Sequence, residues 1–232
     1  MSTATNFTVF AVVGSDFHMG SGTFNARFFL DTIRKYNYRW LILNGDIYDE
    51  GAELNADEKE VVAYLKANAW RIIYIRGNHD PARISKILGI KTRRRFKLTV
   101  AGKKIVIIHG HQFDKFLFFF TEPRVDWLLA KFFAFLQWID PNKWHCGKWM
   151  DSLHARFARH ATKAAARYAK RHRRHAIVVG HNHIECAERK LLGKIRKKPI
   201  EYLNSGCWTK KVCSLVAICE NGELQLHLFQ MP

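Results

Sequence analysis

One pattern occurs five times in this 232-residue chain: an apolar, largely β-branched run that ends in Asp, Asn or His beside a glycine. Such runs are typical of buried strands, and glycine lets the backbone turn sharply where a run ends. In open α/β sheets, ligands bind in the crevice beyond the carboxyl ends of the strands. We therefore predict that five strand ends bring oxygen and imidazole ligands to one sheet edge. The five runs with their polar ends span residues 9–18, 40–49, 71–80, 105–111 and 176–183.

Each of these polar side chains, taken alone, has a simpler interpretation as the cap of a turn. Five coincidences on one edge favour a common site instead. The candidate ligands are more than one divalent ion needs, but they suit two ions that share a carboxylate. Two-metal sites stabilise the attacking and leaving oxygens of a displacement at phosphorus, and they lower the pKa of a bound water to about 7. The seven candidates are Asp16, His18, Asp46, Asn78, His109, His181 and His183.

The types of donor atom also narrow the choice of metal ion. Carboxylate, amide and imidazole groups together suit Mn, Fe, Co, Ni or Zn better than Ca or Mg, and the lack of a thiolate disfavours a structural zinc site.

The five cysteines form no CxxC pair, and their odd number is typical of a reducing compartment. The N-terminal apolar run leads directly into Asp16 and His18, which predicts a strand rather than a signal peptide. No apolar stretch reaches about 20 residues, so we expect a cytoplasmic protein without a transmembrane helix.

The rest of the chain predicts a single domain over residues 1–232. Helical spacing of apolar residues marks 24–36 and 56–68, and the acidic pair Asp57-Glu58 begins the second helix. Residues 96–100 and 104–108 predict a hairpin that turns at Ala101-Gly102. The tail predicts strands at 184–190, 200–204, 212–219 and 224–229, with turns at Leu192-Gly193 and Asn221-Gly222.

Between His111 and His181 the pattern changes, and we predict a helical cap insertion at about 112–174 over the ligand-bearing edge. Residues 113–120 are nearly all aromatic or aliphatic, and Pro123 begins a helical pattern that Pro141 ends. A further helix is predicted over 152–174, with an apolar side and a basic side. The basic side holds Arg156, Arg159, Lys163, Arg167, Lys170 and Arg171.

The formal net charge of +18 implies an anionic partner. Three kinds fit such a charge: a phosphorylated substrate, an anionic membrane surface, or nucleic acid. The charge alone does not choose among them.

The five motifs resemble those of the calcineurin-type metallophosphoesterases, and they occur in that family's order. The resemblance implies an α/β fold, a four-layer α/β/β/α sandwich, and two divalent metal ions. The motifs are Asp16-x-His18, Gly45-Asp46-x-x-Asp49, Gly77-Asn78-His79-Asp80, the later His109, and Gly180-His181-x-His183.

By position, the resemblance also implies roles for the residues, with Asp46 bridging the two ions. One ion would be held by Asp46 with Asp16, His18 and His183, and the other by Asp46 with Asn78, His109 and His181. His79, beside Asp80, would stabilise the phosphoryl transition state or protonate the leaving oxygen, as an Asp–His pair can.

His109-Gly110-His111 offers two imidazoles where the family needs one. We choose His109, which directly follows the apolar run, and expect His111 to face the substrate or to support a ligand residue. Asp49 is expected to support a ligand residue too.

A finer resemblance is to the UDP-2,3-diacylglucosamine pyrophosphatases of lipid A synthesis. It rests on His109-Gly-x-x-Phe113-Asp114, on the helical cap, and on Tyr202-x-Asn204-x-Gly206-x-Trp208. This branch implies hydrolysis of UDP-2,3-diacylglucosamine to UMP and 2,3-diacylglucosamine 1-phosphate. Among the metals that suit the donor set, we expect Mn²⁺ first. The cap would shelter the acyl chains, and the candidate substrate contacts are His111, Phe116, Phe120 and Phe132.

The same branch implies a protein peripheral to the inner membrane of a Gram-negative-type bacterium, with its basic helix on anionic headgroups. Well-known members of that branch have Arg where this chain has His79, whereas His79 fits the wider superfamily.

Two other interpretations stay open. A nucleotide or nucleic-acid phosphodiesterase would use Arg93-Arg94-Arg95 and residues 170–174 as phosphate contacts, with binding that depends steeply on salt. A non-catalytic scaffold would keep the sandwich and use its cap to bind protein, although the complete ligand set argues against it. The Phe-rich block fits an ordinary buried cap or a dimer face as well as an acyl site.

Overall fold

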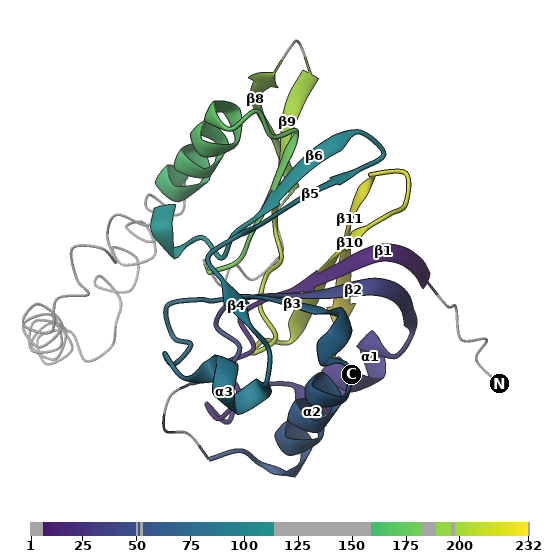
Figure 1. Cartoon of the computed structure of the whole chain (residues 1–232), viewed down its shortest axis with the longest axis vertical. Coiled ribbons are helices and arrows are strands. Elements are labelled where there is room, and N and C mark those ends of the chain that lie inside the picture. The colour runs from purple at the N-terminus through teal and green to yellow at the C-terminus, as the bar shows by residue number, and fades with distance from the viewer. Residues whose placement is uncertain are drawn as a thin grey trace, which may run out of the picture.

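The computed structural model describes residues 7–49, 51, 53–113, 159–181, 189–195 and 198–231, which form two β-sheets with helices on their outer faces (Figure 1). The six-stranded sheet has the order β11-β10-β1-β2-β3-β4, and the five-stranded sheet has the order β5-β6-β7-β9-β8. The first contains β1 (Phe7–Gly14), β2 (Tyr36–Asn44), β3 (Ile72–Ile75), β4 (Thr92–Arg93), β10 (Val212–Ile218) and β11 (Leu224–Gln230). The second contains β5 (Phe96–Val100), β6 (Lys103–Ile107), β7 (Ala176–Val179), β8 (Arg189–Ile195) and β9 (Lys198–Asn204).

Parallel pairing brings the important strand ends to the same side of each sheet. β1 pairs in parallel with β2, β2 with β3, and β3 with β4. In the second sheet β6 and β7 are parallel, as are β7 and β9, while β5 and β8 are antiparallel edge strands. The carboxyl ends of β1, β2 and β3 therefore share one edge, as do those of β6 and β7.

The central strands are buried on both faces, which explains why they read as unbroken apolar runs. Successive side chains point to opposite faces, so Ile42 packs between the sheets while Leu41 packs against helices. In β6, Ile107 packs between the sheets and Val106 packs on the outer side, with Ala165 and other residues of the helical segment 159–171. The described residues thus form three hydrophobic cores: one between the two sheets, and one on the outer side of each sheet beneath its helices.

Three helices cover the outer face of the six-stranded sheet: α1 (Ala26–Ile33), α2 (Ala56–Ala67) and α3 (Ile84–Leu88) (Figure 1). The α2 helix begins with a capping box, in which Asn55 Oδ1 accepts from the Glu58 N–H and Glu58 Oε2 accepts from the Asn55 N–H. Glu58 Oε1 also accepts from the Gly20 N–H at 2.8 Å. The cap thus ties α2 to the loop that follows β1.

The predicted α/β sandwich is confirmed, with one correction to its layout. The five ligand-bearing strands do not share one sheet: β1, β2 and β3 belong to the first, and β6 and β7 belong to the second. The predicted hairpin at Ala101-Gly102 and the two early helices are present.

In the tail, the predicted turn at Leu192-Gly193 is wrong, and most of the strand predicted at 184–190 lies outside the described residues. Leu192-Gly193 is not a turn, because β8 continues through it to Ile195 with a register shift between Leu192 and Lys194. Gly193 adopts a positive φ of 65°, so its missing side chain serves a bulge within the strand. Most of the predicted cap, residues 114–158, lies outside the described residues. Among the residues described, no helix is long and apolar enough to cross a membrane.

Candidate metal centre

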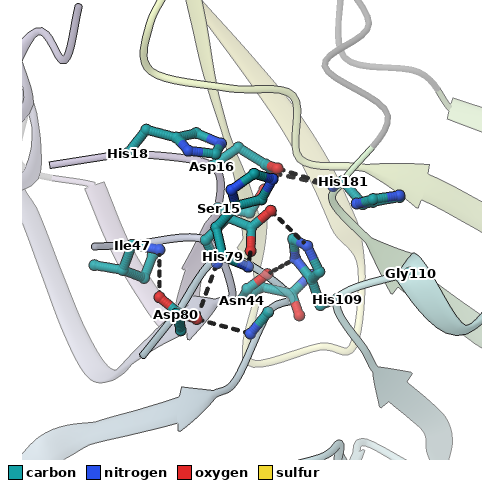
Figure 2. Close-up of polar contacts among 12 residues, drawn as sticks. Ser15, Asp16, His18, Asn44, Ile47, His79, Asp80, His109, Gly110 and His181 are labelled. Carbon is teal, nitrogen blue, oxygen red and sulfur yellow. Dashed lines mark hydrogen bonds and ion pairs between the residues drawn. The ribbon is translucent and has the colours of Figure 1, made fainter. Parts of the chain in front are cut away.

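Five candidate ligands converge where the carboxyl ends of the two sheets meet, and Figure 2 labels four of them, Asp16, His18, His109 and His181. Asp16 and His18 follow β1, and Asp46 follows β2. His109 follows β6 and His181 follows β7, so these two come from the second sheet. The centre is therefore built from both sheets, and all five side chains are nearly or fully buried.

The backbone of these loops is held in an uncommon conformation. The φ angles are 56° at Asp16, 50° at His18, 53° at Asp46 and 72° at His181. Non-glycine residues seldom adopt such values, and strained positions of this kind cluster at functional sites. Four of the candidate ligands thus share a conformation that only the surrounding fold can hold in place.

Two glycines make the close packing of the ligands possible. A Cβ atom on Gly45 would collide with the imidazole of His109, and one on Gly77 would collide with the carboxylate of Asp46. Glycine is needed at these positions because the backbone of one loop approaches the side chain of another. This explains the glycines that directly precede Asp46 and Asn78 in the sequence pattern.

Asp46 and His109 form the most deeply buried pair of the centre. His109 Nδ1 donates to the carbonyl oxygen of Asn44 at 2.7 Å, which leaves Nε2 facing Asp46 Oδ2 at 3.0 Å. Neither Nε2 nor Oδ2 has another hydrogen-bond partner among the described residues. A histidine oriented through one ring nitrogen while the other faces a carboxylate has the arrangement of a metal ligand.

The electrostatics of this pair favour a positive charge between its two atoms. Burial alone would raise the pKa of Asp46, but the imidazole of His109 and the backbone N–H of His79 hold it well below its usual range. Burial likewise opposes protonation of His109, yet Asp46 raises the pKa of His109 to about 9. A proton or a metal ion can supply that charge, and the two compete for the same ligands.

Two groups of ligand atoms meet around Asp46. Within each group the atoms lie within 4.8 Å of one another. Asp16 also links the sheets, because its two carboxylate oxygens accept from the His181 N–H at 3.1 and 3.0 Å. The donor types and their closeness fit divalent metal ions. The groups are Asp16 with His18 and Asp46, and Asp46 with His109 and His181.

His79 lies on the solvent side of the centre. Its side chain is exposed, its backbone N–H donates to Asp46 Oδ1 at 2.9 Å, and its ring centre is 5.0 Å from that of His18. His18 is oriented in turn by Asp49, whose Oδ1 lies 2.9 Å from His18 Nδ1. The expectation that Asp49 contacts a candidate ligand agrees with this distance.

Asp80 differs from its predicted pairing with His79. Its buried carboxylate accepts five hydrogen bonds, and none of them comes from His79. The Tyr74 hydroxyl donates at 2.6 Å, and the other donors are backbone N–H groups of the two ligand-bearing loops. This corrects the expected Asp–His pair, because the carboxylate instead fixes the loop that carries Asp46. The backbone donors are Gly77 at 2.7 Å, Ile47 at 2.8 Å, Asp46 at 3.0 Å and Tyr48 at 3.2 Å.

A cleft of about 520 Å³ opens beside the centre. Asn78 is exposed and borders this cleft, as does His111, whose ring centre lies 5.4 Å from that of His109. Burial and the neighbouring imidazoles lower the pKa of His111 to about 4. The residues that line the cleft are Arg76, Gly77, Asn78, Thr92, Arg93, Arg94, His111 and Gln112.

Sequence reasoning missed several residues that shape the site. Arg76 lines the cleft, and its only signal is a basic residue between a buried strand and Gly77. Ser15 Oγ lies 2.6 Å from Ser205 Oγ, and the backbone N–H of Trp208 donates to the backbone carbonyl of Asp16 at 3.1 Å. The loop after β9 therefore braces the loop of Asp16, which gives the Tyr202 to Trp208 motif a structural role.

Several predicted site residues lie outside the described part of the chain. They are His183, Phe116, Phe120 and Phe132.

A two-sheet α/β sandwich with clustered carboxylates and imidazoles at its strand ends defines a metal-dependent class of phosphoesterases. The model of the calcineurin-like phosphoesterase family matches residues 11–185, which is more than half of the chain. The protein therefore belongs to the calcineurin-like phosphoesterase family. The family is metal-dependent, and the ligand groups around Asp46 are its candidate metal site here.

Several solved structures resemble this chain at low identity, and those with a TM-score of 0.50 support the fold alone. A single mutant of Vps29 from Entamoeba histolytica is 18% identical with a TM-score of 0.50, over 96% of this chain and 99% of the other. Wild-type Vps29 from the same organism, complexed with Zn²⁺, is 17% identical with a TM-score of 0.50, over 95% and 98%. The E. coli phosphoesterase Yfce is 15% identical with a TM-score of 0.45, over 96% and 99%. A comparison with curated protein sequences gives no match.

Proposed function

We propose that the protein is a phosphohydrolase that uses two divalent metal ions, held at the centre around Asp46. The observation that carries this proposal is that two groups of ligand atoms share the Asp46 carboxylate. The buried atoms Asp46 Oδ2 and His109 Nε2 add support, since they face each other without other partners among the described residues. Mn²⁺ is our first choice, and Fe, Co, Ni and Zn fit the same donors.

The proposed ligands follow from the family resemblance and from the groups around Asp46. Asp16, His18, Asp46 and His183 would hold one ion, and Asp46, Asn78, His109 and His181 the other. When bound, such ions polarise a phosphoryl oxygen and lower the pKa of a water.

The chain's own residues would position and protonate the substrate. His79 is exposed at the solvent side of the centre, where its imidazole can stabilise charge on a phosphoryl oxygen or protonate the leaving oxygen. Asp80 contributes indirectly, because its hydrogen bonds fix the loops that carry Asp46 and His79. Asp49 would keep His18 oriented through Nδ1.

The proposed substrate is UDP-2,3-diacylglucosamine, cleaved to UMP and 2,3-diacylglucosamine 1-phosphate. The support is the resemblance of the motif after β6 and of the motif from Tyr202 to Trp208, together with a basic cleft beside the centre that suits a phosphorylated ligand. The predicted acyl contacts Phe116, Phe120 and Phe132 belong to this proposal.

We also propose that the protein works at an anionic membrane surface in the cytoplasm. The helical segment 159–171 buries Ala161, Ala165 and Ala169 against the second sheet and exposes a basic face. Each Lys or Arg near an anionic lipid surface contributes about 1 kcal/mol to binding. The exposed basic residues are Arg159, Lys163, Arg167, Lys170 and Arg171.

A nucleotide or nucleic-acid phosphodiesterase is the alternative, and one observation favours it. Arg93 and Arg94 line the cleft beside the centre, where they could contact phosphates of a nucleic-acid backbone. Oligonucleotide binding that weakens steeply with salt would support this alternative, whereas dependence on detergent and acyl-chain length would support the lipid substrate.

The deciding experiment is release of UMP from UDP-2,3-diacylglucosamine with added Mn²⁺, with Asp46→Ala as the blank. Asp31→Ala is the matched control, because Asp31 is exposed on α1 and contacts only Arg27 among the ion pairs described. We expect metal-dependent turnover in the wild type and in Asp31→Ala, and none in Asp46→Ala.

The other outcomes separate the remaining possibilities. Hydrolysis of bis(4-nitrophenyl) phosphate without UMP release would keep the two-metal site and remove the lipid substrate. Bound metal without turnover of either compound would contradict an enzyme and leave a scaffold.

A further inference from the structure

The cleft beside the metal centre carries a concentration of positive charge, and the proposed function does not say which part of the substrate it binds. Arg76, Arg93 and Arg94 all line it, and all three are exposed. Among the described residues, the lining contains no carboxylate. The cleft is thus open to solvent and strongly basic.

The backbone brings these arginines together from two separate segments. Arg76 directly follows β3, and its N–H donates to the Arg93 carbonyl at 2.8 Å. Arg93 belongs to β4, which pairs in parallel with β3 through Ile75 opposite Arg93. The Arg93 guanidinium lies 5.8 Å from the ring centre of Phe96, which restricts its position. A strand of only two residues is enough to place Arg93 beside Arg76.

The arginine cleft also adjoins the reacting centre. Its lining includes His111, which lies beside His109, and Asn78, which directly precedes His79 in the chain. A group bound among the arginines would therefore be a near neighbour of a phosphate held at the metal centre.

We propose that this cleft binds the second phosphate of a diphosphate substrate, the one that is not attacked. The inference rests on the proposed function and deepens it, because it selects phosphoanhydrides over phosphate esters without a second phosphate. Arginine presents a planar fork of N–H donors that matches phosphate oxygens. A cleft of about 520 Å³ also has the size of a small-molecule site rather than of an extended surface track.

Arg95 provides a matched control within the same run of arginines. Its guanidinium donates to the Tyr168 hydroxyl at 2.7 Å, and it is not among the residues that line the cleft. Arg95→Ala removes the same charge as Arg93→Ala or Arg94→Ala, but from outside the cleft.

The test is calorimetric binding of UDP and of UMP to the full-length, Mn²⁺-loaded protein. It compares the ratio of the two dissociation constants in the wild type, Arg76→Ala, Arg93→Ala and Arg95→Ala. We expect the wild type to prefer UDP, and each cleft variant to lower that preference by about tenfold, the value of one charge-assisted contact. Arg95→Ala should keep the wild-type ratio. Arg76→Lys tests geometry, because an ammonium keeps the charge without the fork and should restore the preference only in part.

Three results would overturn the proposal: an unchanged ratio in both cleft variants, an equal loss for UMP and UDP, or an equal change in Arg95→Ala. A short oligothymidylate that binds more tightly than UDP and loses affinity in the same variants would assign the cleft to nucleic acid instead. The assay needs no turnover, so a failed UMP-release experiment with an intact UDP preference would reject the proposed reaction and keep the diphosphate site. Urea unfolding of each variant shows whether it is folded.

Discussion

Asp46 and Asp80 are both buried carboxylates in neighbouring loops, but their surroundings differ. Asp80 accepts five hydrogen bonds, from Tyr74 and from four backbone N–H groups. Asp46 accepts a hydrogen bond at Oδ1 from the backbone N–H of His79, while its Oδ2 faces His109. One carboxylate is saturated by the chain, and the other still has an oxygen directed at the candidate ligands.

This difference separates a structural carboxylate from a ligand. A buried carboxylate costs a large desolvation free energy unless hydrogen bonds or opposite charges offset it. The Asp80 environment supplies that compensation within the chain, so Asp80 has nothing left to offer a ligand. The Asp46 environment supplies it only with a positive charge between Oδ2 and His109 Nε2. The experiments below test this contrast.

The largest expected effect is on metal binding and turnover in Asp46→Asn. The amide keeps the shape but removes the charge that both ligand groups share. Since loss of even an outer partner of a metal ligand costs about 10- to 100-fold, we expect turnover to fall by at least about 100-fold. Metal content per chain, measured by plasma mass spectrometry, should fall with it. Full metal occupancy in this variant would contradict the assignment.

The next effect is on the stability of Asp80→Asn, measured by urea unfolding of chelator-treated protein. The amide nitrogen would face N–H donors where a carboxylate oxygen now accepts, so several hydrogen bonds to a charged group are lost together. At about 1.5–3 kcal/mol for each such bond, we expect the free energy of unfolding to fall by about 3 kcal/mol or more. Asp46→Asn, treated identically, should lose less. The reverse order would break the comparison.

A milder change is Tyr74→Phe, which removes one of the five donors to Asp80. The Tyr74 hydroxyl is fully buried and donates at 2.6 Å, while four backbone donors remain. We expect the free energy of unfolding to fall by about 1–2 kcal/mol. Tyr64→Phe is the control, because the hydroxyl of the partly buried Tyr64 pairs with the neutral hydroxyl of Tyr38 rather than with a carboxylate. A larger loss in the control would mean that the Asp80 network contributes little.

The smallest expected effect is on the pH dependence of stability, through a hydrogen-bonded pair outside the metal centre. His227 Nδ1 is hydrogen-bonded to the hydroxyl of the buried Tyr36, and burial lowers the pKa of His227. When folding lowers the pKa of a histidine, the neutral side chain contributes its full stability at pH values above the unfolded-state pKa of about 6.5. That contribution is lost as the pH falls from there through the pKa of the folded state. The difference in unfolding midpoint between wild type and His227→Gln should therefore shrink from pH 7.5 to pH 5.5. A constant difference would exclude this linkage.

The sequence was sufficient for features that depend on local pattern. The candidate ligands follow apolar runs and stand beside glycines, so their convergence could be predicted without knowing the strand order. Their division between two sheets could not. β6 pairs with β7 across more than sixty residues, and nothing in either run tells which of the two sheets it joins.

Two residues show why the rest of the site escaped prediction. Asp80 was paired with His79 because they are adjacent in the chain, but two of its donors lie 33 and 34 residues away. Arg76 lines the cleft beside an arginine on a strand of two residues, which is too short to show any periodicity. Contacts between loops decide both cases, and they depend on the tertiary fold.

The short strand β4 also has a consequence for association between molecules. It forms one border of the six-stranded sheet, where a long, flat strand would present unpaired N–H and C=O groups to other chains. A strand of two residues presents few such groups. Arg93, Arg94 and Arg95 also repel the same arginines of a second copy of the chain. The arginine run therefore protects this border of the sheet from edge-to-edge aggregation, whatever ligand the cleft binds.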